Sequence, residues 1–192
     1  EDAIVLLGFC SESLYPIVFT ALNTGMRLSE ILNLTWNRVH INSVINPFIE
    51  LNQTKNNKRR AIPLSDEMVE LLQGLQGKDK TFVFIGERGS PLKSVRKPFQ
   101  TALKKSGILD FRFHDLRHTF SSHFVMQGGD LLTLKEILGH SSMEMVERYA
   151  HLAQAHKRKQ VQNLDGLFSQ RHLNVTCDNV VGLAVNDGSL SS

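Results

Sequence analysis

Cysteines and long apolar runs are scarce in this sequence, and each scarcity excludes a class of protein. Only two cysteines occur among the 192 residues, Cys10 and Cys177, and they lack the spacing of metal ligands. We interpret them as incidental thiols in a reducing compartment, which excludes a secreted disulfide framework. No apolar run approaches the ~20 residues of a membrane-spanning helix, and no signal peptide opens the chain. The sequence therefore predicts a soluble, cytoplasmic protein without a membrane partner.

A large excess of charge of one sign is also missing. The chain has 22 lysines and arginines against 19 aspartates and glutamates, a formal net charge of only +3. The basic residues are nevertheless clustered, because residues 55–60 hold four of them and no acid, and residues 93–117 hold seven against two acids. Such clusters are expected of a protein that binds a phosphate backbone, although a charge run taken alone is more often a solvated face.

Apolar periodicity predicts a mainly helical chain. Steps of three and four residues predict helix over the first 34 residues, with a break at 23–25 and a second short helix capped by Ser29. Segments 48–54 and 60–64 contain β-branched residues and flank a polar turn, which predicts a β-hairpin. Residues 81–85 (TFVFI) predict a third strand.

Capping signals indicate where the later helices begin. Ser65 is expected to cap one helix and Asp130 a short one, LLTLKEIL. Ser141 with Glu144 forms a possible capping box for a helix that carries Tyr149. Two more helices are predicted from apolar residues at steps of four, Val95, Phe99 and Leu103 in one and Leu116, Phe120 and Phe124 in the other.

These elements add up to a mainly α domain with a small antiparallel β-sheet, of the α+β class. Hydrophobic residues make up 41% of the chain, which is enough for one core. We expect the domain to cover 1–173, and 174–192, rich in Asn, Asp, Gly and Ser, to be a flexible C-terminal tail. The phenylalanines are expected in the core and not as a platform for bases: Phe99, Phe111, Phe113, Phe120 and Phe124.

Six residues have the side chains needed to move a phosphodiester onto a hydroxyl: Arg27, Lys55, His114, Arg117, His140 and Tyr149. Arginine suits the non-bridging oxygens, because its planar fork matches phosphate and stays charged. A tyrosine must lose its proton, and a histidine is the natural acceptor near neutral pH. A lysine at a hairpin tip can protonate the departing 5′ oxygen.

The contexts of these residues are more specific than the residues themselves. They read TGMRLSE at 24–30, TK at 54–55, HDLRHTF at 114–120 and LGH at 138–140, and Tyr149 follows nine residues later in ERYAH. Over roughly residues 14–155, this order and spacing closely resemble the catalytic domain of tyrosine recombinases, the phage integrase family.

The resemblance implies the tyrosine recombinase catalytic fold and an enzyme that cleaves and rejoins double-stranded DNA without a metal or nucleotide cofactor. Tyr149 would be the nucleophile that forms a 3′-phosphotyrosine intermediate. Arg27 and Arg117 would clamp the scissile phosphate, and His140 would donate a hydrogen bond to it. His114 would be the acid/base partner of the tyrosine.

The sequence offers more than one candidate for the general acid. The resemblance assigns it to Lys55, but Lys58, Arg59 or Arg60 is an alternative, with the others of this group contacting the DNA backbone. We favour Lys55, because it follows Thr54 at the end of a strand.

Glu30 and the other histidines receive structural interpretations. Glu30 is expected to orient an arginine. His114 and His118 lie four residues apart, but the glutamate of a zinc-protease helix and a third ligand are missing, so no metal site is expected. His118 is expected to be satisfied by backbone or a carboxylate, and His151 and His156 to lie on the surface.

The resemblance favours a site-specific recombinase or integrase of a mobile element, bacterial or phage-encoded and nucleoid-associated, that acts on DNA as a tetramer. A type IB topoisomerase and a catalytically silent DNA-binding regulator are the alternatives. The family's N-terminal core-binding domain is absent from this chain, which begins at Glu1. We therefore expect an excised domain that binds DNA weakly. Leu164, Leu167 and Phe168 predict a helix that docks either in cis or on a neighbouring protomer.

Overall fold

The computed structural model describes residues 2–43, 46–52, 59–86, 92–153, 156–157 and 161–167. The chain divides into two units, Glu1–Ala153 and Gln154–Ser192, and the first contains all of the elements from α1 to η3. No helix among the described residues is long and apolar enough to cross a membrane. The expected boundary at residue 173, the tail beyond it and Phe168 lie outside the described residues.

Three short helices form the N-terminal part: α1 (Asp2–Gly8), α2 (Tyr15–Thr24) and α3 (Leu28–Leu32). The predicted break is confirmed, since α2 ends at Gly25 in a left-handed conformation with φ of 62°. The prediction that Ser29 caps the next helix is wrong. The N-cap of α3 is Arg27, two residues earlier, because the Glu30 carboxylate turns back to accept the backbone N–H of Arg27 at 2.8 Å.

The sheet is antiparallel with the order β1-β2-β3. The predicted hairpin is confirmed as β2 (Phe48–Asn52) and β3 (Arg59–Pro63), and its turn lies outside the described residues. The third strand is β1 (Val39–His40), which follows the 3-10 helix η1 (Trp36–Arg38). The expected strand at 81–85 is wrong, because among the described residues this segment forms isolated bridges, such as Thr35 to Phe82, and no continuous ladder, and it places Val83 and Phe84 in the core.

The remaining predicted helices are present as α4 (Asp66–Leu75), α5 (Arg96–Ser106), α6 (Asp115–Met126) and α7 (Leu131–Leu138). The caps at Ser65 and Asp130 are confirmed, because each side chain accepts a backbone N–H of the first turn. The capping box at Ser141 is wrong. Helix α8 (Glu144–Glu147) begins without a side-chain cap, and Tyr149 lies after it, before the 3-10 helix η3 (Ala150–Ala153).

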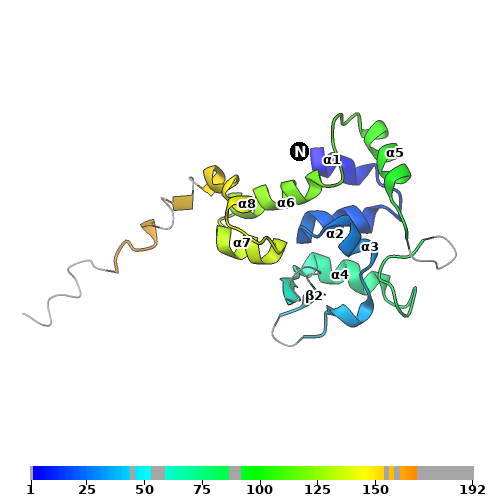
Figure 1. The fold of residues 1–192 in the computed structure, drawn as a ribbon, viewed down its shortest axis with the longest axis horizontal. Coiled ribbons are helices and arrows are strands. Elements are labelled where there is room, and N and C mark those ends of the chain that lie inside the picture. The colour runs from blue at the N-terminus through cyan, green and yellow to red at the C-terminus, as the bar shows by residue number, and fades with distance from the viewer. Residues whose placement is uncertain are drawn as a thin grey trace, which may run out of the picture. The chain divides into compact units, whose positions relative to one another are not determined.

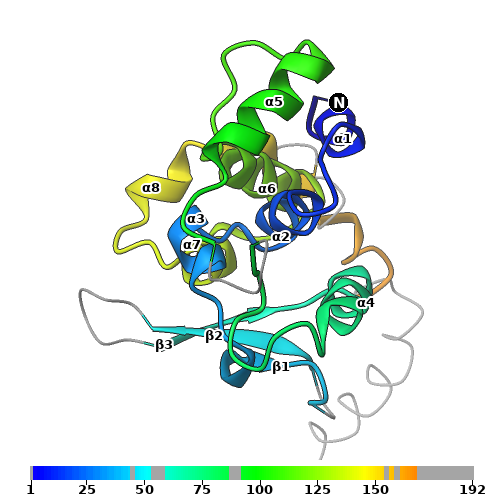
Figure 2. The same ribbon diagram turned by 90° about the vertical axis from the view of Figure 1, so that its right-hand side faces the viewer.

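Helices and sheet occupy opposite sides of the first unit. Figure 2 shows α1, α2, α5 and α6 on one side and the sheet with α4 on the other. Helix α2 packs on α6, while α7 contacts both α6 and β3. Along Figure 1, α7 and α8 lie at one end of α6. The phenylalanines pack in or against the core as expected: Phe99, Phe111, Phe113, Phe120 and Phe124.

Gly25 lies where three helices meet. A Cβ at this position would lie 2.5 Å from a ring carbon of Phe120 in α6 and 2.7 Å from a methyl carbon of Leu138 in α7. Only glycine therefore combines the positive φ with this close approach of backbone to side chains. The turn between α2 and α3 is pressed against α6 and α7 as a result.

Replacing Gly25 by alanine is expected to lower the free energy of unfolding by about 3 kcal/mol, from the overlap with Phe120 and Leu138 and from the left-handed backbone. Gly74→Ala is the matched control. Gly74 is exposed in α4 with nothing within 4 Å of its would-be Cβ, so alanine should stabilise the chain by up to ~1 kcal/mol. Urea denaturation of both variants measures the difference, and a G25A variant as stable as the native chain would contradict the packing described.

Candidate active site

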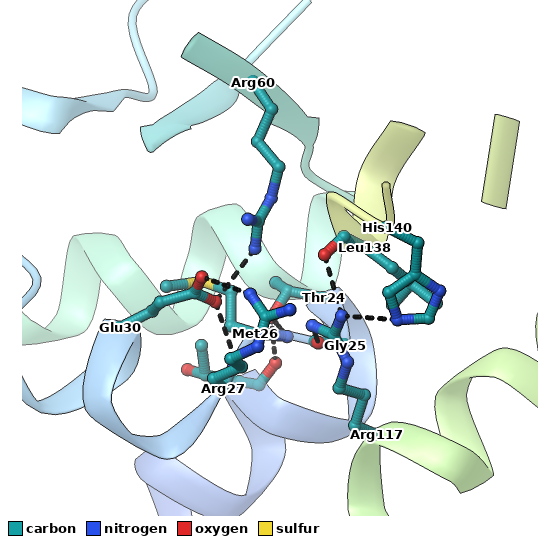
Figure 3. Close-up of polar contacts among 10 residues, drawn as sticks. Thr24, Gly25, Met26, Arg27, Glu30, Arg60, Arg117, Leu138 and His140 are labelled. Atoms are coloured by element: carbon teal, nitrogen blue, oxygen red, sulfur yellow. Dashed lines mark hydrogen bonds and ion pairs between the residues drawn. The ribbon is translucent and has the colours of Figure 1, made fainter. Parts of the chain in front are cut away.

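Arg117 is the buried centre of the site, with 3% of its surface exposed. It projects from the first turn of α6, and its Nη1 donates to the Gly25 carbonyl at 2.6 Å and its Nη2 to the Leu138 carbonyl at 2.7 Å. Figure 3 shows the guanidinium between these two carbonyls. They stand at the C-terminal ends of α2 and α7, where carbonyls lack a helical partner and attract a cation. Burial, and next Arg27, lower the pKa of Arg117 to about 10, so it remains charged at neutral pH.

His140 completes the contacts of Arg117. Its Nε2 lies 3.0 Å from Nη2 of Arg117. An arginine only donates, so Nε2 accepts, and the neutral ring carries its proton on Nδ1. Burial, followed by Arg117 and Arg27, lowers the pKa of His140 to about 4. Nδ1 is buried and has no hydrogen-bond partner among the described residues, which leaves a donor available beside the two arginines.

Glu30 holds two further arginines. Its Oε1 accepts from Nη1 of Arg27 at 3.1 Å, and its Oε2 accepts from Nη2 of Arg60 at 2.9 Å (Figure 3). Burial alone would raise the pKa of Glu30, but the backbone N–H of Arg27 and the guanidinium of Arg60 hold it below its usual range. The expectation that Glu30 orients an arginine is confirmed. Arg60 is 6% exposed and points inward, whereas Arg27 is 42% exposed and remains open to a ligand.

Tyr149 is 6% exposed and packs with Val125, Leu134, Leu138 and Val146. Its hydroxyl is not free, because it lies 2.6 Å from Nδ1 of His118. His118 was expected to pair with backbone or a carboxylate, and that expectation is wrong.

The other motif histidine, His114, is exposed just before α6 and meets the ring of His118 edge-on, with 5.0 Å between centroids. Burial, then His118 and Arg117, lower its pKa. His151 is exposed as expected, while His156 is half-buried.

Two cavities meet at His114 and Arg117. One of about 220 Å³ is lined by His114, Arg117, His118, Ser121, His140, Met145, Arg148 and Tyr149. The other, of about 210 Å³, is lined by Met26, Arg27, Leu28, Phe113, His114 and Arg117. Each is several times the ~30 Å³ share of a water molecule, so the pair offers room for a phosphate group between the arginines and the tyrosine.

The hairpin residues are described only in part. Lys55 and Lys58 lie outside the described residues. Arg59 is largely exposed and pairs with Glu50 at 3.3 Å. Five of the predicted site residues therefore line the two cavities: Arg27, His114, Arg117, His140 and Tyr149. His118 lines one of them as well, although the sequence predicts only a structural role for it.

A model of the phage integrase family matches residues 6–156. The chain belongs to the phage integrase family. The chain is 36% identical to the integrase of Salmonella phage P22 over 181 residues. The match covers 88% of this chain and 46% of the P22 integrase. It is 30% identical to the tyrosine recombinase XerC of Staphylococcus carnosus over 146 residues, 71% of the chain and 48% of XerC.

The solved catalytic domain of bacteriophage HP1 integrase has the same fold as this integrase-family chain. The match has a TM-score of 0.64 at 35% identity and covers 88% of this chain and 92% of that domain. The predicted fold class is thereby confirmed. The chain spans about half the length of the curated relatives it matches.

Glu30→Gln is expected to destabilise this integrase-family chain by about 3 kcal/mol, because Arg60 would remain buried without its counter-charge. Glu50→Gln is the matched control, since it removes the carboxylate from an exposed pair with Arg59 and should change the free energy of unfolding by less than about 1 kcal/mol. Urea denaturation compares the two variants, and equal effects would show that Glu30 does not anchor the arginines.

Lowering the pH is expected to destabilise the chain through His140. Its folded pKa is about 4 against an ordinary 6.5, so between these values the unfolded chain binds a proton that the folded chain does not. The contribution of neutral His140 to the free energy of unfolding is therefore fully present above about pH 6.5 and is lost as the pH falls toward 4. His140→Gln keeps an acceptor for Arg117 without titrating.

The comparison is the free energy of unfolding of the native chain and of H140Q at about pH 7 and pH 4.5. Because His140 is only half-buried, the loss on acidification should be smaller in the variant by about 1–2 kcal/mol. The same pH dependence in both proteins would exclude a neutral His140 in the folded chain.

Proposed function

We propose that this chain carries the catalytic centre of a site-specific DNA recombinase or integrase, which cleaves and rejoins double-stranded DNA through a 3′-phosphotyrosine intermediate. The observation that carries the proposal is the cavity in which the Tyr149 hydroxyl, Arg117 and three histidines meet. The match to integrases and to a tyrosine recombinase supports it. No observation favours the topoisomerase or the silent regulator.

The proposed reaction conserves bond energy. The oxygen of Tyr149 attacks the scissile phosphorus, and its proton passes to one histidine of the pair formed by His114, just before α6, and His118 in α6. The bond from phosphorus to the 5′ oxygen breaks, and Lys55 as general acid supplies the proton that this oxygen needs. Attack by the 5′ hydroxyl of a second strand reverses each step, so the chemistry needs neither a nucleotide cofactor nor a metal.

The arginines suit the transition state. Arg27 and Arg117 line adjoining walls of one cavity, where their charges would hold the non-bridging oxygens as negative charge develops on the phosphate. His140 Nδ1 has a proton to donate to the same group. Because Arg117 is already fixed by two carbonyls, the site needs little rearrangement when the phosphate enters.

The surroundings of the site agree with a DNA backbone as ligand. Arg59 in β3 is largely exposed, and we propose that it contacts phosphates. We propose the same contact for Lys58, which lies outside the described residues. A phosphate contact by Arg60 stays a prediction that the structure does not favour. The Arg60 side chain is buried and already paired with Glu30. A tetramer on DNA, nucleoid association and docking of the segment after residue 164 are further parts of the proposal.

The test is covalent trapping on a pool of nicked suicide duplexes of randomised sequence. The native chain should form an SDS-resistant protein–DNA adduct, and sequencing the trapped DNA should reveal a preferred site. Tyr149→Phe should abolish the adduct, because the other hydroxyl that lines the described cavity, that of Ser121, is buried and donates to the backbone carbonyl of Arg117 at 2.8 Å. The chain has only two tyrosines, so Tyr15→Phe, at the exposed start of α2, is a matched control that should trap DNA like the native chain.

Two results would contradict the proposal. One is an adduct that survives Tyr149→Phe, which would place the nucleophile elsewhere. The other is a native chain that binds the duplexes, as measured by fluorescence anisotropy, yet forms no adduct.

A further inference from the structure

The hydroxyl of Tyr149 is already paired before any DNA is bound. Its oxygen lies 2.6 Å from Nδ1 of His118, and the described part of the chain offers it no other hydrogen-bond partner. A neutral imidazole with its proton on Nε2 presents Nδ1 as an acceptor. The phenol then donates to this nitrogen, which is the arrangement needed to pass on its proton.

The fold fixes both partners of this hydrogen bond. Tyr149 is held by apolar packing against α6 and α7, and the 3-10 helix η3 that follows it packs on α6. His118 lies one residue beyond Arg117 in α6 and lines the same cavity. The distance between the hydroxyl and the imidazole is thus set by the packed core and does not wait for a ligand.

His114 faces a different part of the site. It precedes α6, is exposed, and lines both cavities together with Arg117, whereas His118 lines only the cavity that contains Tyr149. Residues four apart lie on the same side of a helix, so the two rings touch, with His118 on the tyrosine side. His114 is therefore placed toward the phosphate and His118 toward the nucleophile.

We infer that His118 is the general base of the reaction and accepts the proton of Tyr149 at Nδ1. The inference rests on the proposed function and deepens it. As the tyrosine oxygen bonds to phosphorus, the O–H proton moves to Nδ1 and His118 becomes an imidazolium. In the rejoining step the tyrosine oxygen leaves phosphorus and takes the same proton back, so no other proton donor or acceptor is consumed at this end.

The charges around His118 are compatible with this transfer. The titratable and charged groups in its cavity are His114 just before α6, Arg117 in α6, His140 after α7, and Arg148 and Tyr149 after α8. His151 on η3 is exposed and does not line the cavity. Among these described groups the arginines provide positive charge beside the tyrosine oxygen as it loses its proton.

The first measurement is the rate of adduct formation on the trapped site as a function of pH. A general base must be unprotonated, so the native rate should rise with pH and then level off. His118→Gln should be slower by about 10²–10⁴-fold and should lose this rise. His114→Gln should keep the rise, and His123→Gln, at an exposed position of the same helix, should match the native chain.

The second measurement separates the base from the acid. A substrate with sulfur at the bridging 5′ position releases a thiolate, which needs no proton. Such a substrate should restore cleavage by Lys55→Ala but not by His118→Gln, because the variant still lacks an acceptor for the tyrosine proton.

The third measurement does not depend on the histidine substitution alone. In a Tyr15→Phe background, Tyr149 is the sole tyrosine, so biosynthetic incorporation of 3,5-difluorotyrosine alters only the nucleophile. The fluorinated phenol loses its proton more readily. The label should raise the rate of adduct formation by His118→Gln at least about tenfold over the unlabelled variant. It should change the rate of the protein that retains His118 much less.

Three outcomes would overturn the inference: native-like cleavage by His118→Gln, rescue of that variant by the sulfur substrate, or loss of the pH-dependent rise in His114→Gln in place of His118→Gln. Equal circular dichroism spectra and urea midpoints show whether a variant is folded, and His118→Asn replaces His118→Gln in all three measurements if His118→Gln is not folded. Absence of any native adduct would instead refute the proposed function.

Discussion

The burial of the Arg117 guanidinium is the constraint on which the rest of this structure depends. A cation with 3% exposure is tolerated only where acceptors surround it, and here they are backbone carbonyls at the ends of α2 and α7. Those two helix ends must therefore come together at one point. Glycine at 25 makes this possible, because any side chain there would collide with Phe120 and Leu138. The same junction brings Arg27, which follows Gly25 by two residues, and His140, which follows Leu138 by two, to the guanidinium.

A second consequence is an excess of positive charge at the site. Arg27 and Arg60 pair with the carboxylate of Glu30, whereas Arg117 has no carboxylate partner among the described residues. His140 is neutral because burial and the arginines lower its pKa to about 4. The repulsion is offset by Glu30 and by the partial negative charge of the helix ends. An arrangement of this kind leaves uncompensated positive charge for an incoming anion, and the unpartnered Nδ1 of His140 adds a donor of fixed direction.

Much of this could be predicted from the sequence, because it depends on local signals. The left-handed glycine at 25, the caps at Ser65 and Asp130 and the hairpin around residues 53–58 are each encoded within a few residues. The prediction at Ser29 was wrong because the Glu30 carboxylate caps the helix at Arg27, where it also pairs with Arg60 thirty residues away. The prediction at Ser141 was wrong because α8 starts after Met143 without a side-chain cap. The segment 81–85 has the composition of a strand, but among the described residues it forms isolated bridges, such as that of Phe82 with Thr35, and no continuous ladder.

His118 shows the limit of reasoning from motifs. Its spacing from His114 was visible, but the sequence cannot show which of two histidines on one helix side meets a tyrosine that lies 31 residues further on. The deciding factor is the end of α8 at Glu147, which leaves Tyr149 outside a helix and packed under α6. The start of α6 thus offers three groups in different surroundings: His114 is exposed just before the helix, Arg117 is buried, and the half-buried His118 lies against the nucleophile. The helix separates the groups that face the phosphate from the group that faces the tyrosine, and a single imidazole could not occupy both places.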